Sequence, residues 1–137
     1  MSRPAGARRR AVGLLRDERG DVAPTVILAP LTIFLVMFVV QMGLFFHART
    51  VLNAAAQDAT RAVQLENATA TDGRAAADAV LSGSEGFLTV TGLAIDDGET
   101  VEVVITADVV SLVPFWSGST SAAASGPKEF FRPEDER

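Results

Sequence analysis

The chain has 137 residues, a net charge of −5 and no cysteine. This length provides for one small domain besides a membrane segment. The lack of cysteine excludes a disulfide framework, a thiolate metal site and a thiol nucleophile.

The charges are distributed unevenly along the sequence. Residues 1–21 hold six arginines and three acidic residues, whereas residues 47–137 hold six basic and fourteen acidic residues. A basic flank is retained in the cytoplasm, so we expect the N-terminus inside and the C-terminal part outside the cell membrane. An acidic exterior argues against a nucleic-acid partner.

Residues 1–20 form an Arg-rich cytoplasmic leader in this interpretation, and an uncharged stretch follows it. Residues 22–46 contain no charged side chain. As a helix, these 25 residues would span ~37 Å, which exceeds the ~30 Å hydrocarbon core of a bilayer. We therefore predict a single transmembrane helix over 22–46.

Three residues stand out within this span. Pro30 removes one backbone hydrogen bond and is expected to bend the helix. Gln41 is the one strongly polar residue near its end, where it either bonds a neighbouring helix or lies at the membrane interface. Gly43 permits close helix contact.

The helix is predicted to continue outside the membrane, over 21–66 in total. Small and apolar residues recur there at spacings of three and four, which places them on one helix face. This stripe would pack either on another helix or on the chain's own C-terminal domain; it consists of Leu52, Ala55, Ala56, Ala59, Ala62 and Val63. The opposite face would be polar and is formed by Arg49, Asn53, Gln57, Thr60, Arg61 and Gln64.

A small extracytoplasmic α+β domain is predicted over 67–131, with a charged tail at 132–137. A short helix would run from Gly73 to Leu81, capped by Thr71 or Asp72. Alternating residues then predict a strand over 87–95, with the odd-numbered residues on one face. They predict a second strand over 100–110, whose apolar face is formed by Val101, Val103, Ile105, Ala107 and Val109. An Asp-Gly hairpin turn at 96–99 would join the two strands. Residues 120–125 give a third strand, after an apolar loop at 111–116.

The fold class is therefore α+β: a long N-terminal helix, a short second helix and an antiparallel sheet of about three strands. The sheet has one apolar face to bury, and the Ala face of the long helix is the long apolar surface available to it.

No pattern in the sequence indicates catalysis. We find no Gly-rich phosphate loop, no His-rich metal spacing and no credible Ser/His/Asp set. We expect a structural protein without a cofactor or a metal, not an enzyme.

A resemblance to a known family rests on the long helix. An Arg-Gly lead precedes the apolar segment, Pro30 and Gln41 lie within it, and 47–49 (HAR) opens an Ala-rich repeat that ends at 60–62 (TRA). The stretches 111–114 (SLVP) and 125–130 (SGPKEF) add to the likeness. Together these features resemble the TadE-like family (TadE/TadG-type, actinobacterial members) of tight-adherence (Tad/Flp) pilus systems.

This resemblance implies a membrane-anchored pseudopilin-like component of a pilus or a related secretion system, in contact with other subunits. Family members are cut by a prepilin peptidase after a Gly, so Gly20 would precede the cut and Asp21 would begin the mature chain. The sequence departs from the pilin pattern at the fifth mature position, which holds Thr25 instead of Glu.

Two alternatives remain open. The chain is an unprocessed single-span assembly partner of another membrane complex, or it is a secreted binding module released after an A-x-A pattern formed by Ala54 and Ala56.

Overall fold

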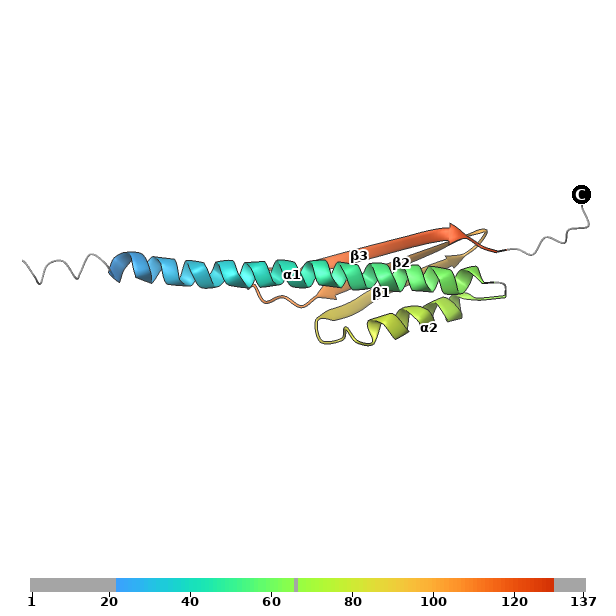
Figure 1. Ribbon diagram of the computed structural model, residues 1–137, viewed down its shortest axis with the longest axis horizontal. Helices are drawn as coiled ribbons and strands as arrows, with labels where there is room; N and C mark the ends of the chain where they lie inside the picture. The colour runs from blue at the N-terminus through green and yellow to red at the C-terminus, as the bar shows by residue number, and fades with distance from the viewer. Residues whose placement is uncertain (1–21, 66, 130–137) are drawn as a thin grey trace, which may run out of the picture. The chain divides into compact units, whose positions relative to one another are not determined.

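The computed structural model describes residues 22–65 and 67–129. It contains, in chain order, α1 (Val22–Gln64), α2 (Ala70–Leu81), β1 (Leu88–Asp97), β2 (Thr100–Val109) and β3 (Gly118–Pro127) (Figure 1). The predicted α+β class is confirmed, with a long apolar helix, a short helix and a three-stranded antiparallel sheet. The chain divides after Phe38 into two compact units, and the hydrophobic core lies in the second.

The sheet has the strand order β1-β2-β3, and both pairs are antiparallel. Leu88 and Gly118 both pair with Val109 at one end of the sheet. Asp97 and Gly126 both pair with Val101 at the other end. The three strands therefore run side by side over their whole length, as two successive hairpins.

An irregularity in β1 was not predicted. The register shifts between Val90 and Gly92, so Thr91 has no opposite residue on β2. Such a bulge changes which side chains face the core, because side chains alternate along a strand. The predicted alternation, with odd residues from Phe87 to Ile95 on one face, is therefore wrong before the bulge: Leu88 is buried there, and Leu93 and Ile95 are partly buried after it.

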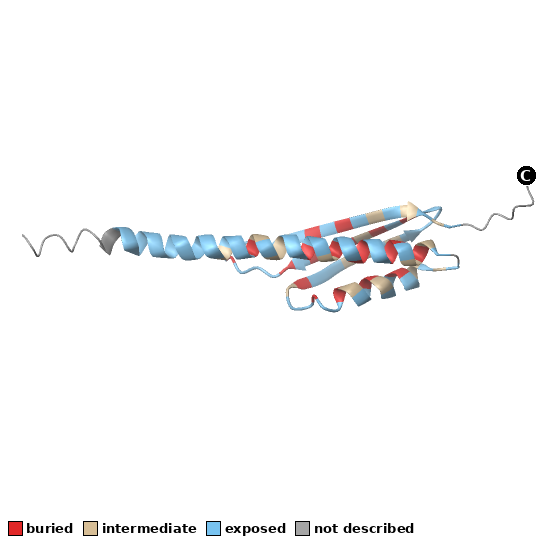
Figure 2. Ribbon diagram, in the orientation of Figure 1, coloured by how far each residue is buried: buried red, intermediate tan, exposed pale blue. Residues whose placement is uncertain are grey.

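The core is formed by one face of the sheet and one face of α1. The predicted apolar face of β2 is confirmed, since its five members are all buried: Val101, Val103, Ile105, Ala107 and Val109. Figure 2 shows buried residues along α1 and along the strands in the second unit. Burial of these aliphatic groups is the main stabilising contribution in such a two-layer arrangement.

The residues of β3 that face the core are all small. They lie opposite the buried positions of β2 and are Gly118, Thr120, Ala122, Ala124 and Gly126. At Gly126 an added Cβ would collide with the end of the Gln64 side chain, which reaches from α1 to the backbone of β3. The absence of a side chain at this position leaves room for it.

The second helix begins three residues earlier than expected. Its N-cap is Thr69 rather than Thr71 or Asp72. The Asp72 carboxylate accepts hydrogen bonds from the Thr69 backbone N–H (2.8 Å) and from its hydroxyl (3.0 Å). A carboxylate three residues after the cap is one half of a capping box, a pattern that stabilises a helix start.

One further expectation is corrected, and one is confirmed. Thr60 is buried, although it was assigned to the polar face; its hydroxyl donates to the Ala56 carbonyl at 2.8 Å, which satisfies the polar group inside the core. The predicted hairpin turn is confirmed, since β1 ends at Asp97 and β2 begins at Thr100. The Gly98 N–H donates to the Asp96 carboxylate at 3.2 Å, so a side chain stabilises the turn.

Candidate functional site

The first part of α1 carries a continuous apolar surface. The side chains of residues 24–40 are exposed, except for a half-buried Met37, as Figure 2 shows for this part of the helix. Ile27 is 70% exposed and Val26 is 66% exposed. A surface of this kind indicates contact with lipid or with another protein, because water-exposed apolar patches of such extent are rare.

Among the described residues, one helix, Pro24–Gln64, is long and apolar enough by its length and composition to cross a membrane. It fits a single-pass membrane protein.

Burial within the chain begins at Gln41. Its side chain is only 2% exposed, and its amide makes two hydrogen bonds to the backbone of the loop after β2. Nε2 donates to the Val110 carbonyl at 3.2 Å, and Oε1 accepts from the Leu112 N–H at 2.7 Å. The Gln41 amide thus provides a hydrogen-bond partner for one carbonyl and one N–H of the backbone that follows the end of β2.

The loop that Gln41 holds has a defined turn. The Trp116 N–H donates to the Val113 carbonyl at 3.2 Å, and Pro114 and Phe115 are the two central residues. Val113 is buried, and its carbonyl also accepts the Ser111 hydroxyl at 2.8 Å. Phe115 has a φ of 68°, which corresponds to the third position of a type II turn, usually occupied by Gly or Asn.

The Ala stripe lies inside the chain's own core. Leu52, Ala55, Ala56 and Ala59 are fully buried, and Ala62 is half-buried. Of the two partners considered for this stripe, the structure therefore places the C-terminal sheet against it. Cleavage after Ala56 would divide the helix that covers the sheet.

The remaining candidate residues lie elsewhere. Pro30 is inside α1 and exposed. Gly43 is exposed, and no atom lies within 4 Å of the position that a Cβ would take. Gly20 and Asp21 lie outside the described residues.

Sequence reasoning identified Gln41 by its polarity but did not find its partner. The Leu112 N–H lies 71 residues away along the chain. The available signal was the loop itself, because Pro114 cannot continue a central strand and the backbone groups beside it need partners.

The described residues contain no group of three or more His, Asp or Glu side chains that could hold a metal ion. One surface hollow in the same part of the chain lies between α2 and β1 and is lined by Asp78, Leu81, Ser82, Glu85, Leu88, Thr89 and Val90. Its polar lining consists of two carboxylates and two hydroxyl groups, and no hydrogen bond between a carboxylate and a hydroxyl joins them into a catalytic set.

These features define a class of protein: a single apolar helix whose second half is the core helix of a small antiparallel α+β domain. The family model for TadE-like protein matches residues 25–61. The resemblance to the TadE-like family is thereby confirmed over the segment that contains both the exposed apolar surface and the buried Ala stripe. No match to the chain was found among curated proteins or among solved structures.

The family match implies a component related to Tad pili that interacts with other pilus subunits. The TadE-like family is structural and is not known for enzymatic activity.

Proposed function

We propose that this chain is a membrane-anchored, pseudopilin-like structural component of Tad/Flp-type pilus assembly or of a related secretion system. The observation that carries the proposal is the coincidence of the family match at residues 25–61 with a helix whose apolar side chains are exposed from residue 24 to residue 40. Such a helix can lie in lipid and can also pack beside other helices in a filament.

The proposed orientation follows from charge. The basic residues before the span are retained in the cytoplasm, and the acidic domain that begins after it lies outside the membrane. A prepilin peptidase would act at the cytoplasmic face, between Gly20 and Asp21.

Mass spectrometry of the membrane-extracted chain tests the processing. In cells that contain the cognate peptidase, we expect a mature chain that begins at Asp21. Gly20→Val should block the cut, whereas Gly13→Val, in the same leader, should not. An intact N-terminus in the wild-type chain would reject the pseudopilin proposal.

A second candidate function is favoured by one residue. Thr25 stands where processed pilins carry a Glu that can pair with a neighbouring N-terminus. Without that carboxylate, an uncut single-span protein that helps to assemble another membrane complex becomes the alternative.

Gly43 offers the sharpest test of a helix contact with such a partner. Gly43→Leu fills open space in this chain and should leave its fold intact, while it blocks close approach of a second helix. We expect partner subunits to be lost on co-purification. Gly83→Leu, also in open space but far along the chain, is the control, and equal recovery of partners with both variants would exclude a contact at Gly43.

A further inference from the structure

A single apolar loop lies beside the last turns of the uncharged helix segment. Its most exposed member is Phe115, whose side chain is fully exposed, and Trp116 is 44% exposed. Leu112 and Val110 are similarly exposed. No charged residue occurs from position 109 to position 119.

We infer that this loop, residues 110–117, docks into the interface of the same bilayer that α1 crosses, with Phe115 entering the lipid. The inference rests on the proposed membrane anchoring of α1. It goes beyond that proposal, because it gives the extracytoplasmic domain a lipid contact of its own.

The depth of the loop is fixed by its hydrogen bonds. Leu112 and Val110 are bonded to the Gln41 side chain, and Gln41 lies inside the uncharged stretch that ends at Phe46. Five helical residues correspond to ~7.5 Å along the axis. The loop backbone therefore lies about one and a half turns on the membrane side of His47 and Arg49, the first ionisable residues after the span.

A second position also lies near the end of the uncharged stretch. A Cβ added at Gly118, the first residue of β3, would lie 3.7 Å from the Phe45 ring and 3.1 Å from Nε1 of Trp116. Gly118 thus lies near both the Phe45 ring and the Trp116 indole, which places the start of β3 at the end of the uncharged stretch. Trp side chains are enriched at this level of membrane proteins, because the ring is apolar and its N–H is polar.

The backbone conformation at Phe115 supports the same inference. A positive φ of 68° is unfavourable for a bulky side chain, and the turn would adopt it at less cost with Gly. The Phe side chain gains no burial within the chain in return. Strain of this kind is typical of residues whose contacts lie outside the chain.

The single tryptophan of the chain provides the test. The full-length protein is reconstituted into vesicles of phosphatidylcholine and phosphatidylglycerol, and part of the phosphatidylcholine is then replaced by its acyl-brominated form. We expect brominated lipid to remove most of the Trp116 fluorescence, and aqueous iodide to have little effect.

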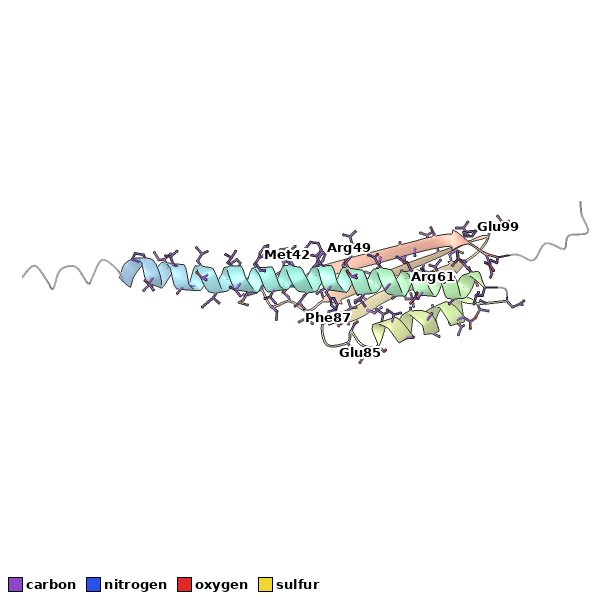
Figure 3. The ribbon with its side chains drawn as sticks, in the orientation of Figure 1. Met42, Arg49, Arg61, Glu85, Phe87 and Glu99 are labelled. Carbon is purple, nitrogen blue, oxygen red and sulfur yellow. The ribbon has the colours of Figure 1, made fainter. Side chains whose placement is uncertain are left out.

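The matched control moves the tryptophan to the other end of the sheet, by combining Trp116→Phe with Glu99→Trp. Figure 3 shows Glu99 at the end opposite Phe87, whose carbonyl accepts the N–H of Val110 at 2.9 Å. In this variant iodide should quench and brominated lipid should not.

The outcomes separate this inference from the proposed anchoring. If the chain floats with the vesicles after a carbonate wash but iodide alone quenches Trp116, the anchoring stands and the loop contact is wrong. If neither quencher reaches Trp116, and dilution in lipid restores access, a second copy of the chain covers the loop and the inference is overturned. If the chain fails to float with the vesicles, both the anchoring of α1 and the lipid contact of the loop are wrong.

Variants of Phe115 give an independent measurement in the otherwise wild-type chain. Phe115→Gly and Phe115→Ala should both reduce the loss of Trp116 fluorescence to brominated lipid. In detergent, Phe115→Gly should raise the melting temperature relative to Phe115→Ala, because only Gly relieves the positive φ. Unchanged quenching in both variants would refute a lipid contact through Phe115.

Discussion

At the scale of the single residue, Gln41 determines where helix and domain are joined. A side-chain amide carries both a donor and an acceptor, and here each finds a backbone partner in the loop after β2. The surrounding sequence is apolar, and these two bonds satisfy the amide where water is excluded. It closes the end of the sheet against α1.

Gln41→Leu is expected to lower the free energy of unfolding by about 1–3 kcal/mol, because it leaves the Val110 carbonyl and the Leu112 N–H without partners. Chemical unfolding of the full chain in detergent, followed by Trp116 fluorescence, measures this loss. Gln57→Leu is the control, since Gln57 is exposed on the same helix. Equal stability of the two variants would show that the Gln41 bonds contribute little.

At the scale of the element, small residues govern how the helices meet the sheet. α1 presents alanines, β3 presents Gly, Ala and Thr, and α2 presents Gly73 to α1 and β1. Larger side chains would separate these elements and open voids between them. At Gly73 the backbone of α2 lies close to the Val63 side chain and the Ala59 carbonyl of α1.

Gly73→Ala tests this close approach. The added methyl group would collide with the Val63 side chain and lie 3.1 Å from Cδ1 of Ile95. Overpacking of this kind costs about 1–3 kcal/mol, although Ala alone would favour the helix by about 1 kcal/mol. Thermal unfolding should show a lower melting temperature for Gly73→Ala than for Gly83→Ala, which meets open space.

The start of α2 gives a prediction that depends on pH. Hydrogen bonds from the Thr69 N–H and hydroxyl lower the pKa of Asp72 below its ordinary value of 3.8. A carboxyl with a lowered pKa stabilises the fold above its unfolded pKa, and this contribution is lost as the pH falls through the lower folded value.

Asp72→Asn should therefore lower the melting temperature at neutral pH, and the difference from wild type should shrink as the pH falls below about 4. Thermal melts across this range measure the effect. Asp78→Asn, on the exposed side of the same helix, is the control. A difference that persists unchanged at low pH would mean that the Asp72 charge is not involved.

At the scale of the whole molecule, charge and hydropathy divide the chain into an Arg-rich leader, an apolar span and an acidic domain. This order predicts a cytoplasmic N-terminus and an external domain. Because the chain lacks cysteine, single cysteines report topology without background.

A membrane-impermeant maleimide applied to intact cells should label Glu99→Cys and leave Ser2→Cys unlabelled. After the cells are opened, uncut Ser2→Cys should react as well. Labelling of Ser2→Cys in intact cells would reverse the proposed orientation.

Much of this fold could be predicted from local sequence patterns. The uncharged stretch and the Ala periodicity predict α1, and the alternation from Thr100 to Val109 predicts the buried face of β2. The bulge at Thr91 could not be predicted, because it arises from pairing with β2 and has no local mark in the sequence. Thr60 was misassigned for a related reason. Its hydroxyl donates a hydrogen bond to the Ala56 carbonyl of the preceding helical turn, so the polar group can be buried at a low cost in free energy.

The candidate site was predictable only in part. Gln41 and the apolar loop were each recognised, but the bonds between them join segments that are far apart in the sequence. Local patterns contain no information about such a pair.

The second half of α1 is fastened to the sheet at two distant points. Gln41 bonds the loop before β3, and the carbonyl of Gln64 accepts the Glu129 N–H at 3.1 Å, just beyond the end of β3. A force along the helix axis would have to shear the whole interface between the alanines of α1 and the sheet, and to break the hydrogen bonds of Gln41 and Gln64 at the same time. With both ends of this helix segment bonded to the domain, α1 can transmit mechanical tension from the membrane anchor to a partner bound by the domain.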